Sequence, residues 1–181
     1  MCGLEYGRFL LTEAVGFPPS WRRDARVLIL GSMPGQRSLA VTQYYAHPRN
    51  AFWPIMTRLF QWPDDLSYEA RLRALQDERV ALWDVIERCK RPGSLDSRIE
   101  SNSVQDNDLA ALVAQMPALA LIACNGGLAY RSVLRRWRGP LEQVAGSRLE
   151  ICQLPSTSSA HASLSIDQKC EHWAMIKRYL T

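Results

Sequence analysis

Four short runs of apolar residues constrain the fold of this chain more than any other feature of its sequence. They span residues 27–30, 80–83, 118–124 and 149–154. The first three are almost continuously apolar, which is typical of strands that are covered on both faces. Helical patterns separate the runs, so the sequence predicts a parallel sheet between two layers of helices.

The segments between the runs carry helical patterns. Residues 52–60 are apolar on one side, and Pro54 falls in the first turn, where proline is tolerated. The other helices are expected over residues 69–77, 106–115, 130–137 and 167–180. No repeat or linker divides the chain, so we expect a single α/β domain over residues 1–181. Its expected architecture is a three-layer α/β/α fold with a short, mainly parallel central sheet of about four strands.

Composition excludes several classes of protein. With 47% hydrophobic and 22% charged residues, the chain is neither disordered nor collagen-like nor a coiled coil. No run of about 18 apolar residues occurs, so we expect no membrane span. Residues 1–17 carry Glu5 and Glu13 where a secretory signal would be apolar, so we expect a cytoplasmic protein. The net charge of +4 indicates an anionic partner only weakly.

The five cysteines are spaced too widely for a metal centre. No C-x-x-C pair occurs, and neither Cys nor His clusters at the spacing of metal ligands, so we expect no metal and no cofactor. An odd number of cysteines argues against a complete set of disulfides. Cys124 and Cys152 are therefore expected to be small apolar residues in a reduced core.

Ligands in parallel α/β folds bind beyond the carboxyl ends of the strands. The segment after the first strand, residues 31–35, reads G-S-M-P-G. Its glycines allow backbone N–H groups to approach a ligand, and Pro34 stiffens the turn. The segment matches neither G-x-G-x-x-G nor the P-loop, which disfavours a nucleotide cofactor and leaves a plain turn as the alternative.

Two further segments favour a nucleic-acid ligand. Residues 43–53, Q-Y-Y-A-H-P-R-N-A-F-W, place aromatic rings, Arg and Asn in a loop that leads into a helix. Aromatic faces stack on bases, Arg binds phosphate, and Asn hydrogen-bonds to a base edge or holds a water. The Ser-rich loop 155–161 suits a phosphate backbone, although such loops are also common without a ligand.

These motifs resemble the uracil-DNA glycosylase superfamily. The resemblance rests on residues 31–35, 44–53, 125–126 and 154–158, which occur in the order and at the strand ends that the superfamily uses. Residues 91–97, R-P-G-S-L-D-S, look like its mismatch-specific branch as well. The resemblance covers roughly residues 25–165. It implies the superfamily's fold and a DNA glycosylase of base-excision repair, which hydrolyses an N-glycosidic bond.

One departure points to a particular branch of the superfamily. Mismatch-specific relatives read G-I-N-P-G, and that Asn positions the attacking water. The aligned residue here is Met33, which can neither hydrogen-bond nor transfer a proton in that way. The G-S-M-P-G form resembles the hypoxanthine-DNA glycosylase branch, which acts on deoxyinosine. There the resemblance implies that the catalytic role passes to Asn50, while hypoxanthine, uracil and xanthine stay open as substrates.

The resemblance also implies roles for the other site residues. Asn50 is expected to orient water in a dissociative mechanism, Tyr45 to stack on the extruded base, and Asn125 to read a polar edge of it. No carboxylate lies within the first motif, and Asp84 and Asp96 are left without a role. The remaining expected residues are Ser32 and Met33 at the base; Gly31, Pro34, Gly35 and His47 in the active-site loop; and Arg49, Ser156, Thr157, Ser158 and His161 at the DNA.

The sequence leaves two possible roles open for a basic helical face, and two for one histidine. Arg131, Arg135 and Arg138 could lie along DNA phosphates or form an ordinary solvated face, and Arg49 is the preferred phosphate contact. His47 is expected to be a structural or phosphate contact, with catalysis as the alternative.

Other functions remain as alternatives. Met33 in the usual Asn position motivates a module that binds damaged DNA without cutting it. A hydrolase using Ser158 with His161 or His47 lacks the G-x-S-x-G elbow. A mismatch-type uracil-DNA glycosylase is the alternative among enzymes. We expect a monofunctional enzyme, because no Lys in the site motifs could form a Schiff base. It is expected to act as a monomer on DNA that contains a deaminated base, away from any membrane.

Overall fold

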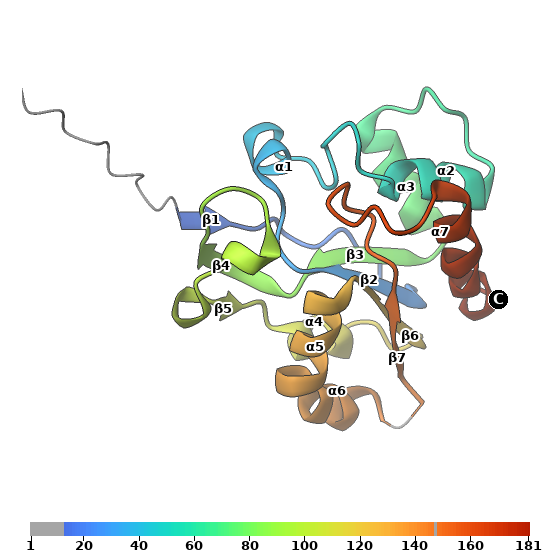
Figure 1. Cartoon of the computed structure of the whole chain (residues 1–181). Helices are drawn as coiled ribbons and strands as arrows, with labels where there is room; N and C mark the ends of the chain where they lie inside the picture. The colour runs from blue at the N-terminus through green and yellow to red at the C-terminus, as the bar shows by residue number, and fades with distance from the viewer. Residues whose placement is uncertain (1–12, 147) are drawn as a thin grey trace, which may run out of the picture.

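A computed structural model describes residues 13–146 and 148–181 (Figure 1). Most of residues 1–17, including Glu5, lie outside the described part, and so does Cys2. Among the residues that are described, no helix is long and apolar enough to cross a membrane.

The central sheet has four parallel strands, as the apolar runs predict. They are β2 (Val27–Gly31), β3 (Val80–Asp84), β6 (Leu121–Asn125) and β7 (Glu150–Leu154), arranged in the order β3-β2-β6-β7. Every residue of β2 is buried. Its neighbours on both sides are parallel strands, which places the G-S-M-P-G segment at the centre of the sheet's carboxyl edge.

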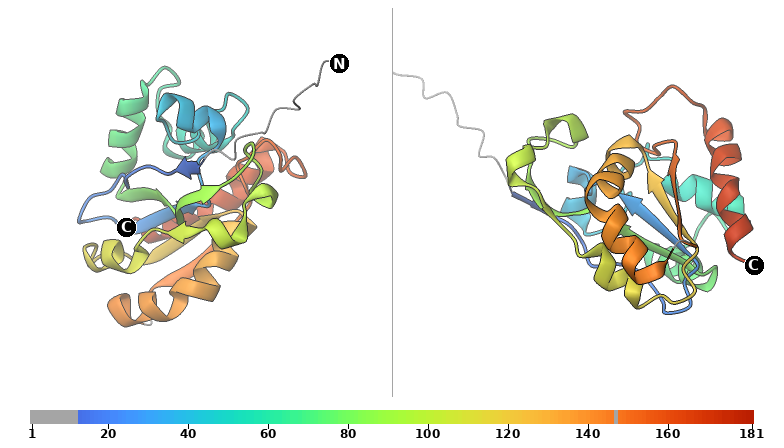
Figure 2. Two further views of the ribbon diagram at one scale, coloured as in Figure 1. Left: turned by 90° about the vertical axis from the view of Figure 1, so that its left-hand side faces the viewer. Right: turned by 90° about the horizontal axis from the view of Figure 1, so that it is seen from below.

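Two layers of helices cover the sheet, which confirms the predicted three-layer architecture (Figure 2). One face is covered by α2 (Phe52–Phe60), α3 (Tyr68–Asp77) and α7 (Ile166–Trp173). The opposite face is covered by α4 (Leu109–Ala114), α5 (Gly127–Ser132) and α6 (Arg138–Ala145).

The alternation of side chains along β2 explains its continuous apolar pattern. Val27 and Ile29 belong to the core beneath α2 and α7, whereas Leu28 and Leu30 belong to the core beneath α4 and α6. Successive residues of a strand point to opposite faces, so a strand covered on both sides needs apolar residues throughout.

A second, antiparallel sheet differs from the prediction. It is formed by β1 (Glu13–Val15), β4 (Ile86–Lys90) and β5 (Gln105–Asp106), in the order β1-β4-β5, at one side of the central sheet (Figure 1). These strands are short and carry charged residues, so they lack an apolar run. The helix predicted from residue 106 begins only at Leu109, because Gln105 and Asp106 pair with β4.

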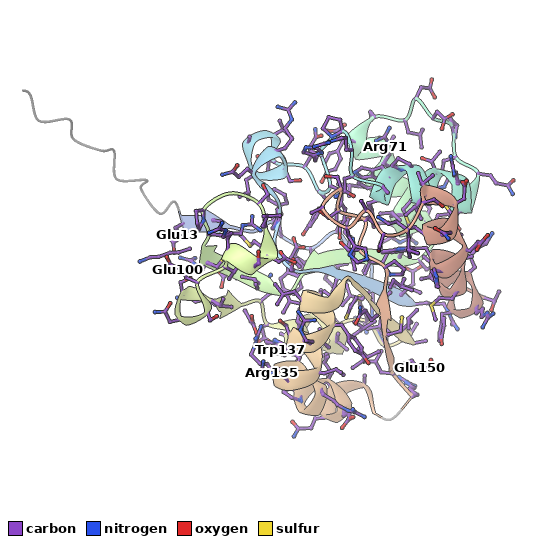
Figure 3. The ribbon with its side chains drawn as sticks, viewed as in Figure 1. Glu13, Arg71, Glu100, Arg135, Trp137 and Glu150 are labelled. Carbon is purple, nitrogen blue, oxygen red and sulfur yellow. The ribbon has the colours of Figure 1, made fainter. Side chains whose placement is uncertain are left out.

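The other helices follow their predicted positions with local changes. The apolar stripe of residues 130–137 runs from α5 into a π-helical turn, Val133–Trp137, before α6 begins. Between Val41 at the end of α1 (Gln36–Val41) and Phe52, the chain forms the predicted aromatic loop. Side chains fill the space between the sheet and its helices (Figure 3).

The described cysteines are free thiols in or near the core. Burial raises the pKa of the Cys124 thiol to about 12 and that of Cys152 to about 11. Thiols with such high pKa values stay protonated and unreactive at neutral pH. For these two cysteines the prediction of a reduced, apolar role is confirmed.

Candidate active site

A cleft of about 600 Å³ opens at the carboxyl ends of the parallel strands. It is lined by residues of the segments that follow β2, β4, β6 and β7, by Asp84 at the end of β3, and by the aromatic loop before α2. The expected site residues in its walls are Gly31, Ser32, Met33, Gly35, Tyr45, His47, Asn50, Asn125, Ser156, Thr157, Ser158 and His161. Pro34 and Arg49 are not among the residues that line it.

The G-S-M-P-G segment is held in place by residues 91–96. The hydroxyl of Ser32 donates to Asp96 Oδ1 at 2.8 Å, and the guanidinium of Arg91 donates to the carbonyl oxygen of Pro34. Pro34 therefore does not line the cleft, but Arg91 fixes the position of its carbonyl group. Met33 is only 6% exposed and packs in a small apolar cluster, so it presents little surface to a ligand.

Asn50 is fixed by the start of α2. Its backbone N–H donates to the carbonyl oxygen of His47 at 2.8 Å, and its Oδ1 accepts a hydrogen bond from the N–H of Phe52 at 3.0 Å. With Oδ1 occupied by the N–H of Phe52, the Nδ2 group of this cleft-lining amide is available as a donor.

Tyr45 forms an aromatic wall of the cleft. Its ring stacks on Phe52 with centroids 4.0 Å apart and an angle of 24° between the planes. Its backbone φ of 55° lies in the left-handed region, which is strained for a tyrosine and is typical of functional sites. Burial raises the pKa of its phenol, so the hydroxyl stays protonated and can donate. Within residues 13–146 and 148–181, that buried hydroxyl makes no hydrogen bond, although the side chain of Asn125 lies near enough to lower its pKa.

Asn125 connects the end of β6 to the Ser-rich loop. Its Nδ2 donates to Thr157 Oγ1 and its Oδ1 accepts from the Thr157 N–H, both at 2.9 Å. The next residue, Gly126, has a φ of 96°, and a Cβ there would lie 3.1 Å from Ser156 Cβ. The amide of Asn125 therefore positions this loop, with one further hydrogen bond available at each end.

Two carboxyl groups at the cleft, the buried Asp84 and the more exposed Asp96, were not assigned a role from the sequence. Asp84 ends β3 and is 3% exposed; burial, and then the nearby Asp96, raises its pKa to about 7, while Arg91 opposes the increase. Burial also raises the pKa of Asp96, against the hydrogen bond from Ser32 and the charge of Arg91. The available signal was position: Asp84 directly follows an apolar run, at the edge of the sheet where ligands bind.

Basic residues at the rim differ from those expected. Arg37 and Arg131 are exposed and line the cleft, whereas Arg49 is exposed but lies outside its lining. Arg135 extends from the turn after α5 (Figure 3), and Arg138 pairs with Glu142 at 3.0 Å. Of the predicted basic face, Arg131 is the residue that the structure places at the cleft.

Histidines at the rim take part in loop structure. His47 Nδ1 accepts a hydrogen bond from the N–H of Arg49 at 3.1 Å. The carbonyl oxygen of His161 accepts one from the largely buried Lys169 at 2.8 Å. Burial lowers the pKa of that Lys169 ammonium group.

The chemistry of the cleft suits a flat, polar ring. It combines an aromatic wall, an amide donor, a phenol donor and carboxyl groups, with arginines at the entrance. Aromatic rings bind planar bases by stacking, and the polar groups can read the edge of such a base. In the part of the chain that the structure describes, no group of three or more His, Cys, Asp or Glu could hold a metal ion.

Comparison with known proteins agrees with this chemistry. A curated protein of Methanosarcina acetivorans described as a hypoxanthine DNA glycosylase is 34% identical over 167 residues, which cover 91% of this chain and 98% of the relative. A protein of the same description from Methanosarcina barkeri is 36% identical over 123 residues, or 66% of this chain and 77% of the relative.

A solved structure has the same fold. The solution NMR structure of a protein from Methanosarcina acetivorans, described as a candidate uracil DNA glycosylase, superposes with a TM-score of 0.76 at 33% identity. The match covers 93% of this chain and 99% of that one. The family model of the uracil DNA glycosylase superfamily matches residues 18–180. This chain therefore belongs to the uracil DNA glycosylase superfamily.

Proposed function

We propose that this protein is a monofunctional DNA glycosylase of base-excision repair that removes hypoxanthine from deoxyinosine. The observation that carries the proposal is the convergence of Tyr45, Asn50 and Asn125 on one cleft. It is supported by 34% identity to a protein described as a hypoxanthine DNA glycosylase, over nearly the whole of both chains.

The reaction begins with the target nucleotide outside the duplex. Flipping it out costs about a few kcal/mol, and the stacking surface of Tyr45, itself supported by Phe52, offsets part of that cost. The arginines Arg37 and Arg131, with the hydroxyls of Ser156 and Ser158, lie where they would contact the phosphates that flank the flipped nucleotide.

Bond cleavage then separates charge. The bond between C1′ and the base nitrogen breaks with its electron pair going to the base, while positive charge builds on the sugar. The oxygen of a water molecule bonds to C1′, and its proton leaves to the released base or to solvent. A placed donor that stabilises the charged base is worth about 2.7–4 kcal/mol, and the Nδ2 group of Asn50 is such a donor.

The catalytic unit is complete within one chain, because Tyr45, Asn50 and Asn125 come from the same copy. This supports action as a monomer, and we assign the protein to the cytoplasm. Hydrolysis by this route consumes only water.

The decisive experiment is single-turnover cleavage of matched oligonucleotides that carry one deoxyinosine, one deoxyuridine or one deoxyxanthosine, each followed by alkali. We expect strand breaks at deoxyinosine and far fewer at deoxyuridine. Cleavage at deoxyuridine alone would assign the protein to the mismatch-type uracil enzymes. Tight binding without release of any base would instead identify a module that recognises damage.

A further inference from the structure

Asp84 lies at the floor of the cleft on a rigid frame. It pairs with Gly31 in the register of β2 and β3, and the N–H of Val85 donates to the carbonyl oxygen of Gly31 at 2.9 Å. The carbonyl oxygen of Asp84 accepts a hydrogen bond from the buried side chain of Asn107 at 2.8 Å. The backbone on both sides of the carboxyl group is therefore fixed before any ligand arrives.

The carboxyl group of Asp84 and the hydroxyl of Tyr45 converge over Gly31. A Cβ added to Gly31 would lie 2.2 Å from Asp84 Oδ1 and 3.1 Å from the hydroxyl oxygen of Tyr45. Within the described residues, neither Asp84 Oδ2 nor that hydroxyl has a hydrogen-bond partner, although both are buried. Buried polar groups are normally paired, so two unpaired groups side by side indicate a place for a ligand.

The other polar side chains of the cleft floor already have partners. Asp96 accepts the hydrogen bond of the Ser32 hydroxyl and is exposed to solvent, and the amide of Asn125 is paired at each end with Thr157. Asp84 is thus the buried carboxyl group of the floor that retains an unpaired oxygen.

A carboxylate acceptor on the protein can distinguish hypoxanthine from adenine by their N1 positions. Hypoxanthine presents an N1–H donor next to the C6 carbonyl oxygen, whereas adenine presents a bare N1 acceptor next to an amino donor. The ionised carboxylate, which predominates above about pH 7, accepts from N1–H but repels the lone pair of adenine N1. A phenol can both donate and accept, so the discrimination rests on Asp84 and not on Tyr45.

We propose that Asp84 reads the N1–H of a 6-oxopurine and so excludes adenine, while the ring of Tyr45 stacks on the base. This inference rests on the proposed function and adds a specificity-determining residue to it. It also explains why residue 31 is a glycine, since any side chain there would fill the space between the carboxyl group of Asp84 and the hydroxyl of Tyr45.

The test pairs a change in the enzyme with a change in the substrate. Single-turnover rates are measured for the wild type, Asp84→Ala and Asp84→Asn on deoxyinosine and on 1-methyl-deoxyinosine, which lacks the N1–H. We expect the wild type to lose about 10- to 100-fold on the methylated base, the range of a hydrogen bond to a charged group. Asp84→Ala should lose a similar factor on deoxyinosine and discriminate little between the two bases, while Asp84→Asn, which keeps an acceptor oxygen, should retain more activity.

Controls separate recognition from folding. Asp77→Asn removes a carboxylate that is 75% exposed in a surface ion pair with Arg22, and it should change neither rate. Each variant is checked by thermal unfolding. If both Asp84 variants cleave deoxyinosine at the wild-type rate, or lose rate equally on both bases, the inference is wrong while the proposed function stands. If the wild type does not cleave deoxyinosine at all, the proposed function fails and this inference with it.

Discussion

The two ends of the Asn50 amide have different tasks. Oδ1 accepts a hydrogen bond from the N–H of Phe52 at the start of α2, and in the proposed reaction Nδ2 donates to the substrate. An amide does not ionise, so Asn50 cannot be a strong base. In the proposed function it contributes a placed donor, which agrees with a dissociative reaction in which the base leaves before water attacks.

Substitution of Asn50 separates these tasks. Asn50→Ala should lower the single-turnover rate on deoxyinosine by about 100- to 1000-fold, since one placed donor is removed, and should lower the unfolding free energy by about 0.5–1.5 kcal/mol through the lost hydrogen bond to Phe52. Asn50→Asp keeps an acceptor for that hydrogen bond and should retain stability while losing the donor. Asn102→Ala, an exposed amide away from the cleft, is the control. Near wild-type cleavage by Asn50→Ala would refute the assignment.

Asp84 makes the stability of the protein depend on pH. Its pKa is about 7 in the folded protein against an ordinary 3.8, so the folded state binds more protons than the unfolded state between these values. Stability therefore falls as the pH rises from about 4 to about 7. Asp96 contributes in the same direction, and Arg91, Tyr44 and Tyr45 are the other titratable groups beside Asp84.

The measurement is denaturant unfolding of the wild type and Asp84→Asn between pH 4 and pH 8. The variant cannot ionise at this position, so its advantage over the wild type should grow up to about pH 7 and then remain constant. An advantage that is the same at every pH would show that Asp84 ionises freely in the folded state.

At the scale of elements, the ends of β2 and β3 create the site. Their parallel register brings Gly31 beside Asp84, and the absence of a side chain at Gly31 leaves room for the carboxyl group and the phenol of Tyr45. The glycine is required by this close approach and not by its backbone angle.

Gly31→Ala should therefore abolish cleavage of deoxyinosine and lower stability by about 1–3 kcal/mol, because the added methyl group overpacks the floor of the cleft. Gly139→Ala is a matched control, since a Cβ at Gly139 in α6 has no heavy atom within 4 Å. That change should leave cleavage intact without a helix-propensity gain, since Gly139 lies in the first turn of α6 and precedes Pro140, where a Cβ disfavours the helical conformation. Wild-type cleavage by Gly31→Ala would contradict the proposed geometry of the floor.

The sequence predicted the elements whose pattern reflects burial on two faces, and it missed those that pair through the backbone alone. The apolar runs located β2, β3, β6 and β7, and the motifs at their ends located the cleft. The strands β1, β4 and β5 carry charged residues and gave no signal. Asp84 could not be assigned because its lack of a partner depends on the register of β3 against β2.

At the scale of the whole molecule, the positions of the positive charges matter more for DNA binding than the net charge does. The net charge of +4 is small, yet Arg37 and Arg131 lie at the entrance of the cleft. The side chain of Arg131 folds back towards the strand ends, since a Cβ on Gly127 would lie 2.8 Å from its Nη1. Phosphates bound at this rim would release counterions, which makes the affinity for DNA depend on salt.

Two arginines on one helical segment test this view. Arg131→Ala should weaken binding to every DNA sequence and reduce the slope of log K against log salt concentration by about 1, because one phosphate contact is lost. Arg135→Ala removes the same charge from an exposed position one turn further on, outside the lining of the cleft, and should leave the slope unchanged. Fluorescence anisotropy with a labelled duplex over a series of salt concentrations measures both slopes. Equal reductions would mean that the DNA follows the whole basic face of the helix, and no reduction in either would place the phosphates elsewhere on the molecule.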